Sequence, residues 1–386
     1  MGVGVEKTDI LFFASFCNTT FCTVKTRSLY HNLYFLHFVN SMLKFCLIVL
    51  LTLLVISACS SFGRQSPNRD LAVVPSTQTS SAPVHVVKHA MGQTLVPVHP
   101  QRVVVIDPWL VEIPLALGAN LVGAPDPTKT LQGLGLEDKH PGVENIGAVL
   151  TPPNMEKVIT LKPDLILGTT RNRDTYSLWS HIAPTVLLKV QSNGDWKKPF
   201  MPAAKALGKT ETAKRLMDNY KARLAELKQK MGSRLKKTLV SVVRLIPQTI
   251  NPLTKGAFSG VILEDAGLIR PASQNLDAKA TQKKAGNPVG YNISPESLTQ
   301  IDGDILFIVR YGFKDPTQSK IAVNQLMAEP LWSKLNVVRQ GKVYVVDDYY
   351  WLTGSYISAN RVIDDLFTYI LQSFQKVEGT HYLQKL

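Results

Sequence analysis

The chain has 386 residues and carries 43 Lys and Arg against 29 Asp and Glu, a formal net charge of +14. Hydrophobic residues make up 45% of the chain and charged residues 19%, which excludes one small domain and a disordered chain and predicts a globular protein with two lobes or more. The basic excess alone leaves three partners open: nucleic acid, an anionic membrane surface and an anionic small ligand.

The N-terminal part has the pattern of an export signal. Residues 45–58, FCLIVLLTLLVISA, carry no charge and follow Lys44. A bilayer span needs about 20 apolar residues, so this run has the length of a signal-peptide hydrophobic region. Its end, Val-Ile-Ser-Ala followed by Cys59, resembles the lipobox of bacterial lipoproteins. We therefore expect an upstream extension over 1–41, a lipoprotein signal peptide over 42–58 that begins at Met42, and lipid on Cys59.

Two consequences follow for the mature chain. Cys17, Cys22 and Cys46 precede the cleavage point and Cys59 is lipidated, so no thiol remains for a disulfide or a metal site. Residues 59–83 are rich in Ser and Pro without an apolar period, which predicts a flexible linker.

Beyond residue 83, short apolar runs alternate with helix-like stretches, as in βα units around parallel sheets. The candidate strands are 102–107, 164–169, 185–190, 239–245, 304–310 and 342–347. Their apolar runs are continuous, as expected for strands covered on both faces. The sequence predicts an α/β fold with a first lobe over 84–197, a connecting helical region over 198–232, a second lobe over 233–376 and a tail over 377–386.

The connecting region contains the strongest helix signal. Residues 210–231 lack Gly and Pro, with Thr210 as the expected N-cap and Gly232 as the stop. At 1.5 Å per residue this helix spans about 33 Å, enough to cross from lobe to lobe. Residues 197–237 hold thirteen Lys and Arg against three acids, so most of the chain's basic excess lies on this solvated helix and its flanks and says nothing about a ligand.

One pattern occurs twice. Glu156 precedes Asp164 by eight positions, Glu296 precedes Asp304 by the same number, and each pair leads from a short helix into a strand. The repeat indicates two related lobes.

These pieces together resemble a class III substrate-binding protein of an ABC importer, the family that serves iron–siderophores, haem and vitamin B12. The resemblance rests on HAMGQT with PQRVV (89–104), NME with LKPDLI (154–166), the long helix, SPESL (294–298) and GKVYVVD (341–347), in this order over nearly 300 residues. It implies two Rossmann-like lobes joined by one long inter-lobe helix, with the ligand in a cleft between them. It also implies that Glu156 and Glu296 dock onto Arg pockets of a membrane permease; the plain alternative is two ordinary helix-start acids.

Ligands of parallel α/β sheets bind beyond the carboxyl ends of strands, where this chain places arginines and aromatic residues in both lobes. The candidate ligand-binding residues are Trp109, Arg171, Arg173, Arg244, Arg310, Tyr311, Tyr349, Tyr350 and Trp351. Such a set predicts an anionic ligand with flat or apolar surface, such as a ferric siderophore of catecholate or citrate-derived type. Taken singly, Arg171 and Arg173 fit a solvated stretch and Trp351 fits the core of its own lobe. Tyr349 or Tyr350 could also coordinate Fe(III) directly.

The expected function is therefore capture of a ferric siderophore outside the cytoplasmic membrane and its delivery to the permease and ATPase subunits of an importer. A binder of vitamin B12 or haem is the alternative, and a membrane-anchored hydrolase ranks below it. The chain has no G-x-S-x-G elbow, dinucleotide fingerprint or Walker A motif, which argues against an enzyme. The mature histidines are dispersed, which argues against a binder of free zinc or manganese. We expect no cofactor, and no motif indicates nucleic acid. We expect a monomer that is lipid-anchored in the periplasm or at the cell surface.

Overall fold

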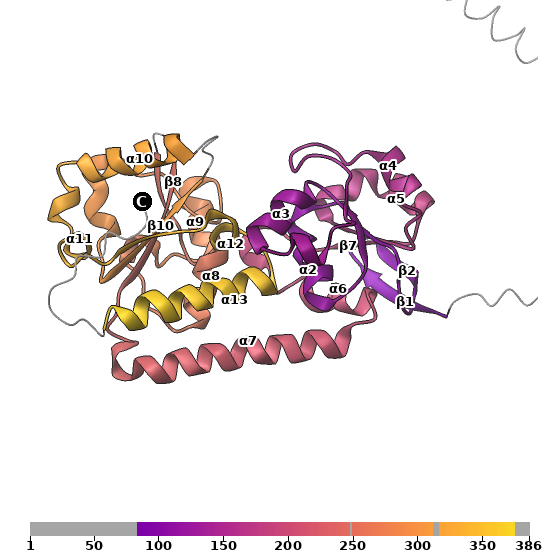
Figure 1. Cartoon of the computed structure of the whole chain (residues 1–386), viewed down its shortest axis with the longest axis horizontal. Helices are drawn as coiled ribbons and strands as arrows, with labels where there is room; N and C mark the ends of the chain where they lie inside the picture. The colour runs from indigo at the N-terminus through magenta and orange to yellow at the C-terminus, as the bar shows by residue number, and fades with distance from the viewer. Residues whose placement is uncertain (1–82, 248, 312–315, 375–386) are drawn as a thin grey trace, which may run out of the picture. The chain divides into compact units, whose positions relative to one another are not determined.

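A computed structural model describes residues 83–247, 249–311 and 316–374, which lie in a single compact unit from Thr79 to Leu386 (Figure 1). The predicted extension, signal peptide, Cys59, the linker up to residue 82 and the tail over 377–386 lie outside the described residues. Within the described ranges, no helix is both long enough and apolar enough to cross a membrane.

The first lobe contains a parallel sheet. Its strands are β3 (Val103–Val105), β4 (Leu121–Ala124), β5 (Glu144–Asn145), β6 (Leu165–Thr169) and β7 (Thr185–Leu188), in the order β5-β4-β3-β6-β7. An antiparallel hairpin of β1 (Val84–His89) and β2 (Gly92–Pro97) precedes it. The helices of this lobe are α2 (Glu112–Leu117), α3 (Pro127–Leu134), α4 (Met155–Thr160), α5 (Tyr176–Ile182) and α6 (Phe200–Ala206).

The second lobe contains a mixed sheet. Its strands are β8 (Val240–Ile246), β9 (Thr249–Pro252), β10 (Ile305–Arg310) and β11 (Val343–Val346), in the order β11-β10-β8-β9. β8, β10 and β11 run parallel, while β9 is an antiparallel edge strand on β8. The helices are α8 (Phe258–Asp265), α9 (Ala278–Ala285), α10 (Pro316–Ala328), α11 (Asn336–Arg339), α12 (Asp348–Leu352) and α13 (Tyr356–Asp365).

Short helical turns fill the connections. The 3-10 turns are η1 (Pro108–Leu110), η2 (Glu137–Lys139), η3 (Thr170–Thr175), η4 (Asn193–Asp195), η5 (Gly232–Arg234), η6 (Ala272–Gln274), η7 (Pro295–Ile301) and η8 (Trp332–Lys334), and η9 (Leu366–Ile370) is a π-helical turn after α13. The repeated acids lie on unlike turns, since Glu156 begins the α-helix α4 and Glu296 begins the 3-10 helix η7.

Each sheet is covered on both faces, which explains the continuous apolar runs. In β3, Val103 and Val105 enter one core of the first lobe and Val104 enters the other. In β10, Phe307 and Ile308 likewise point into opposite cores of the second lobe. Successive side chains of a strand point to opposite faces, so a strand between two cores has no polar face. All six predicted strand segments are confirmed.

Helix α7 (Thr210–Met231) belongs to both lobes, as predicted. Ala213 packs into the first-lobe core, whereas Tyr220, Leu224 and Leu227 pack into the second-lobe core. The helix ends at Gly232, whose φ of 54° suits a residue without Cβ. The predicted N-cap is wrong: Thr210 is the first helical residue, and the preceding Lys209 makes no side-chain cap.

The segment over α12 and α13 ties the second lobe to the first. The buried Glu112 carboxylate of α2 accepts from Ser355 N at 2.7 Å, from Ser358 N at 3.1 Å and from the Ser358 hydroxyl. The Arg361 guanidinium donates to the carbonyl of Leu134 at the end of α3. A carboxylate from one lobe therefore caps the N-terminus of a helix of the other.

Candidate ligand-binding site

The carboxyl ends of β3 and β6 bring four predicted or neighbouring residues of the first lobe together. Asp107, which follows β3, is 1% exposed at its side chain and accepts from the Arg171 guanidinium at 3.0 Å (Nε) and 2.7 Å (Nη2). The Thr169 hydroxyl donates to the same carboxylate. The Arg171 guanidinium lies 3.9 Å from the ring centroid of Trp109. Arg171 is thus held between an acid and an aromatic face.

This arrangement orients Arg171 and also compensates its charge. Two of its three guanidinium nitrogens already donate to Asp107, so its long-range attraction for an anion is reduced and the third nitrogen remains for a ligand. Arg173 is exposed on the same turn, η3, and no described carboxylate lies within ion-pair distance of it. In the first lobe, Arg173 is therefore the less compensated arginine.

In the second lobe, β8 and β10 place Arg244 beside Tyr311. The Arg244 guanidinium lies 5.7 Å from the Tyr311 ring and donates to Asn251 Oδ1 at 3.2 Å, while its Nε is buried and has no hydrogen-bond partner among the described residues. Burial lowers the pKa of Arg244, but a guanidinium stays protonated at any ordinary pH. No described carboxylate pairs with it. A half-buried cation without an acid is the arrangement that an anionic ligand would complete.

Arg310, at the end of β10, and Lys129 of the first lobe both influence the charge of Asp348. Partial burial and the neighbouring Asp347 raise the pKa of Asp348, whereas Lys129 of α3 and Arg310 lower it. Cations from both lobes therefore lie near one carboxyl. The predicted set lacked Lys129 and Asp348, because neither belongs to the arginine and aromatic classes that the strand-end pattern singled out.

The three consecutive aromatics after β11 have different surroundings, and only Trp351 is fully buried. Trp351 is completely buried, its Nε1 donates to Asp365 at 2.7 Å, and its ring lies 4.6 Å from that of Phe307. The Tyr350 hydroxyl donates to the same Asp365 at 3.1 Å. Trp351 is therefore a core residue of its own lobe, as the alternative interpretation held, and its buried ring is not accessible to a ligand.

Tyr349 packs across the lobe boundary. A Cβ at Gly133 of α3 would lie 2.4 Å from Cγ of Tyr349, so this glycine leaves the room that the ring fills. Burial raises the pKa of Tyr349 and of Tyr350, with Glu112 adding to the first rise and Asp365 to the second. Fe(III) coordination by Tyr349 or Tyr350 stays a prediction.

Comparison with known proteins places this geometry in a family. The family model described as periplasmic binding protein matches residues 103–350. The chain belongs to the periplasmic binding protein family. Its relatives include the probable siderophore-binding lipoprotein YfiY of Bacillus subtilis, 33% identical over 84% of this chain and 97% of that protein. The iron(3+)-hydroxamate-binding protein FhuD of the same organism is 30% identical over 84% of this chain and 96% of that protein.

A solved structure of the family has the same fold. Staphylococcus aureus SirA complexed with staphyloferrin B matches with a TM-score of 0.64 and 27% identity, covering 74% of this chain and 98% of SirA. The resemblance to the siderophore-binding family is therefore confirmed, as is the two-lobed α/β fold with its long helix. Periplasmic binding proteins of this kind are non-catalytic substrate-binding components of ABC transporters, which implies permease partners. That relatives are lipoproteins suggests an extracytoplasmic location.

In this periplasmic binding protein the two repeated acids are accessible. Glu156 is exposed in the first turn of α4, where the Asn154 side chain caps the helix by accepting from Lys157 N at 3.0 Å. Glu296 is exposed in η7, and hydrogen bonds from Ser294 and from its own backbone lower its pKa. The Glu296 carboxylate is therefore charged at neutral pH. Docking by the pair stays a prediction.

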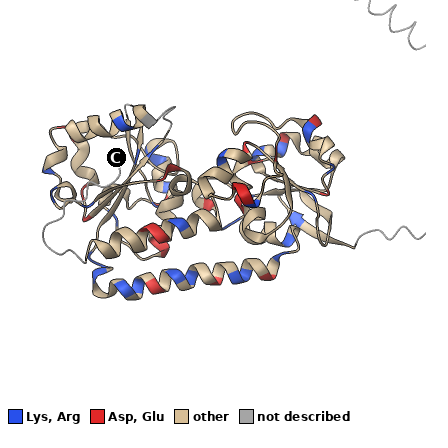
Figure 2. Cartoon of the chain, viewed as in Figure 1, with Lys and Arg blue, Asp and Glu red and all other residues tan. Residues whose placement is uncertain are grey.

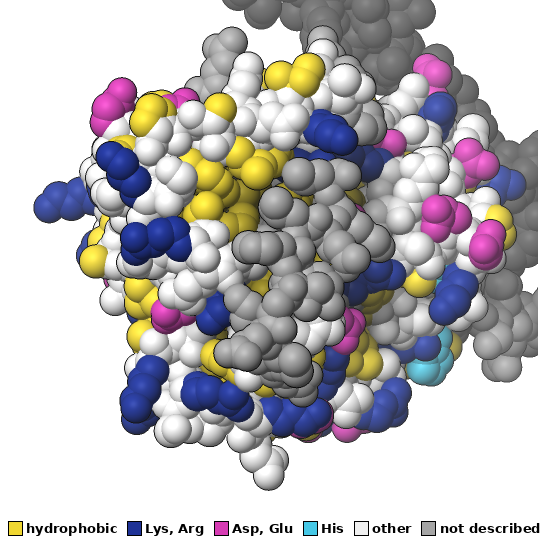
Figure 3. All heavy atoms as spheres, turned by 60° about the vertical axis from the view of Figure 1, so that its left-hand side comes forward, with side chains coloured by type: hydrophobic (Ala, Val, Ile, Leu, Met, Phe, Trp, Pro, Cys, Tyr) yellow, Lys and Arg dark blue, Asp and Glu magenta, His cyan; other side chains and the backbone are white. Residues whose placement is uncertain are grey.

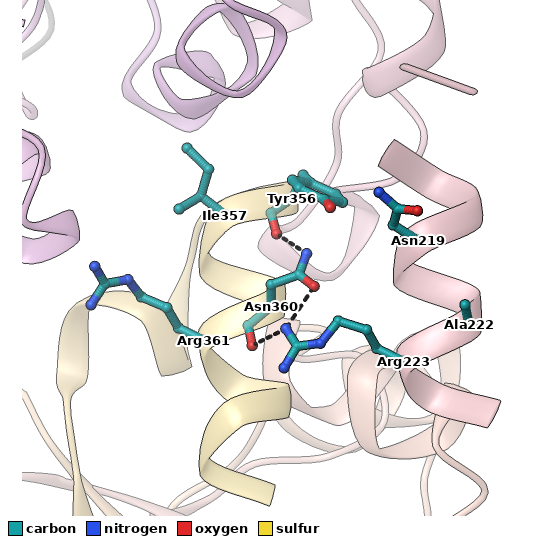
Figure 4. A pocket seen from close by; sticks show the side chains of 7 residues that line it. All are labelled: Asn219, Ala222, Arg223, Tyr356, Ile357, Asn360 and Arg361. Atoms are coloured by element: carbon teal, nitrogen blue, oxygen red, sulfur yellow. Dashed lines mark hydrogen bonds between the residues drawn. The ribbon is translucent and has the colours of Figure 1, made fainter. Parts of the chain in front are cut away.

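The periplasmic binding protein also has a cavity that the sequence did not indicate. About 540 Å³ lies between α7 and α13, lined by Asn219, Ala222, Arg223, Tyr356, Ile357, Asn360 and Arg361 (Figure 4). The Arg223 guanidinium donates to Asn360 O at 3.1 Å and to Asn360 Oδ1 at 2.9 Å and pairs with Asp364. No predicted ligand-binding residue lines this cavity, and its Arg223 is already partnered. Over the described ranges, no group of His, Cys, Asp and Glu could hold a metal ion.

Proposed function

We propose that this chain is the substrate-binding lipoprotein of an iron importer, which captures a ferric siderophore at the carboxyl ends of the strands of its two lobes and delivers it to a membrane permease. Lipid on Cys59 would hold it at the outer face of the cytoplasmic membrane, and Glu156 and Glu296 would dock it. The proposed ligand contacts are Trp109, Arg171, Arg173, Arg244, Arg310 and Tyr311, and Lys129 joins them.

The environment of Arg244 is the observation that best indicates the class of ligand. This arginine is half-buried, its Nε has no partner, and no described acid compensates its charge. Burial of an unpaired cation is unfavourable, so a ligand that brings a carboxylate or another anionic oxygen recovers energy the free protein lacks. Two relatives support a siderophore as the ligand: SirA was solved in complex with staphyloferrin B, and YfiY is named a probable siderophore-binding lipoprotein. We infer an anionic complex of carboxylate or catecholate type.

The test is a titration of intrinsic fluorescence in the purified mature protein. Bound ferric complexes are coloured and should quench Trp109, whose ring lies against Arg171. We expect saturation with a ferric citrate or ferric tricatecholate complex, weakened by added salt because the contacts are charged. Saturation by cobalamin or haemin without response to any ferric complex would overturn the iron assignment. Binding of a neutral ferric hydroxamate without salt dependence would overturn the anionic class.

Substitution of Arg244 by Gln tests the residue itself. Removing one partner of a buried charged contact costs about 2 kcal/mol or more, so the Kd should rise by about 30-fold. Arg339→Gln is the matched control, since Arg339 is exposed on α11 and its guanidinium donates to Asn336. Equal affinities for the two variants would show that Arg244 does not contact the ligand.

A further inference from the structure

The C-terminal end of α7 and the turn after it form a basic surface that the proposed function does not use. Residues 227–240 contain no Asp or Glu, and five exposed cations lie within them: Lys228, Lys230, Arg234, Lys236 and Lys237. We call these five residues the basic end of α7. Figure 2 shows Lys and Arg dense at this end of the helix, whereas the rest of α7 alternates in charge.

The cations at this end are poorly compensated. Earlier in the helix, Lys214 pairs with Glu211 at 2.7 Å and Lys221 pairs with Asp218 at 3.1 Å. Within the basic end, Lys230 pairs with Glu226, and none of the other four cations has a described carboxylate within ion-pair distance. In Figure 3, which turns the second lobe forward, dark blue side chains predominate along the lower edge, the level at which α7 lies in Figure 1. The surface therefore carries a positive potential toward solvent.

Aromatic rings lie beneath these cations. The Arg234 guanidinium is 4.3 Å from the ring centroid of Phe374, and the Lys230 ammonium is 5.2 Å from that of Phe367. Both rings are only partly buried. Basic residues beside partly exposed aromatic rings are typical of surfaces that bind anionic membranes, where the cations meet lipid phosphates and the rings reach the headgroup boundary.

The other end of α7 lies where the N-terminal chain enters the domain. The Pro83 carbonyl accepts from Val98 N at 2.8 Å, and the His85 side chain hydrogen-bonds to the carbonyl of Lys205 at 3.0 Å. Lys205 is in α6, which ends just before α7 begins at Thr210. The chain that would carry a lipid on Cys59 therefore enters the domain near the start of α7, about 33 Å from its basic end.

We propose that the basic end of α7 binds anionic phospholipid headgroups of the membrane that anchors the protein, so that α7 lies along the bilayer surface. The inference rests on the proposed lipid anchor, which supplies one contact, while the basic end supplies the second at the opposite end of the same helix. The helix α4 with Glu156 lies on the opposite side of the molecule from α7 (Figure 1). Docking on the permease through Glu156 would therefore require the domain to leave this orientation, so the lipid contact belongs to the undocked protein.

The experiment measures vesicle binding without the lipid anchor. The unit from Thr79 to Leu386 contains every described strand and helix and its own hydrophobic cores, so it can be studied alone. It is sedimented with vesicles of phosphatidylcholine, or of phosphatidylcholine and phosphatidylglycerol in equal parts. We expect binding to the anionic vesicles, release by salt and no binding to the neutral ones.

Charge reversal locates the surface. A cation near an anionic membrane raises partitioning by about fivefold, so the triple variant Lys228→Glu, Lys236→Glu, Lys237→Glu should bind at least about 100-fold more weakly. The matched control is Lys279→Glu, Lys283→Glu, Lys334→Glu, which changes three exposed, unpaired lysines and gives the same net charge. We expect the control to retain binding apart from a small loss caused by net charge.

Two results would overturn the proposal: no binding of the unsubstituted unit to anionic vesicles, or an equal loss in both triple variants, which would make net charge the cause. Thermal unfolding of both variants checks that they fold. Fluorescence titration with the ferric complex should give unchanged affinity in the triple variant. Failure of ligand binding in all proteins, with vesicle binding intact, would count against the proposed function alone.

Discussion

The contact of Glu112 with α13 allows a prediction with a worked magnitude. Substitution of Glu112 by Ala leaves the buried amides of Ser355 and Ser358 without an acceptor. Each unsatisfied donor costs about 1–3 kcal/mol, and a cavity adds to this, so we expect a loss of about 3–5 kcal/mol. For a unit of this size the Tm falls by about 2 °C for each kcal/mol, which gives a decrease of about 6–10 °C.

Substitution by Gln should behave differently. Its carbonyl oxygen can take the two amide hydrogen bonds, and its amino group can donate to the Ser358 hydroxyl, which then turns round. Burial raises the pKa of the Glu112 carboxyl, and the bonds from the two serines and the charge of Arg361 oppose the rise. The dominance of burial means that the charge is costly, so Glu112→Gln should be as stable as the unsubstituted protein or slightly more stable at neutral pH.

The raised pKa of Glu112 determines the direction in which stability changes with pH. Between the ordinary pKa of a glutamate and the raised value in the folded protein, the folded state binds more protons than the unfolded chain. The stability that Glu112 contributes is therefore fully present below the ordinary pKa and is lost as the pH rises through the folded pKa. Because Gln does not titrate, the stability of the unsubstituted protein relative to Glu112→Gln should be greatest in acid and decline toward neutral pH.

The assay is thermal unfolding of both variants and the unsubstituted protein from acid to neutral pH, with Glu137→Ala, an exposed acid on η2, as the control. A Tm for Glu112→Ala equal to that of the control would refute the contact. If Glu112→Gln lost as much stability as Glu112→Ala at neutral pH, the carboxylate charge itself would be stabilising and the argument from burial would be wrong.

Two further predictions concern the lobe boundary and the permease. Gly133→Ala places a Cβ 2.4 Å from Cγ of Tyr349 and should cost about 1–3 kcal/mol in thermal unfolding, whereas Gly142→Ala, with no atom within 4 Å of its Cβ, serves as the control. A Tm for Gly133→Ala that matches the control would contradict tight packing of Tyr349. The double variant Glu156→Ala, Glu296→Ala should bind the ferric complex normally and abolish uptake by cells, because both acids are exposed and neither belongs to the proposed ligand contacts. Weaker ligand binding in that variant would show that the acids belong to the ligand site.

Much of the fold could be predicted because its signals are local. The runs at 164–169 and 304–310 are long and apolar, and both became central strands between two cores. β4 escaped prediction because Gly123 interrupts its apolar run, and β5 because its two residues, Glu144 and Asn145, are polar. The antiparallel β9 escaped prediction because Asn251 and Pro252 leave it no apolar run.

The site was less predictable because its contacts are distant in sequence. Arg171 was expected to bind the ligand or to be solvated, but its guanidinium pairs with Asp107, which lies 64 positions earlier, just after a neighbouring strand of the sheet. The order Tyr349, Tyr350, Trp351 indicated aromatic side chains near a strand end, yet only packing decides which of them face the first lobe, an acid or the core. Spacing along a chain identifies strand ends and leaves side-chain direction open.

The packing of α7 into the cores of both lobes affects how an importer would distinguish a ligand-bound binding protein from a ligand-free one. Because α7 packs with Ala213 in one lobe and with Leu224 and Leu227 in the other, a large rotation between the lobes would have to bend a regular helix or pull it from a core. The surface that the binding protein presents to a permease would then differ little between its ligand-free and ligand-bound forms. The ligand-free binding protein would therefore compete with the ligand-bound form for the same docking site on the permease. Import would slow when the binding protein is in excess over its ligand.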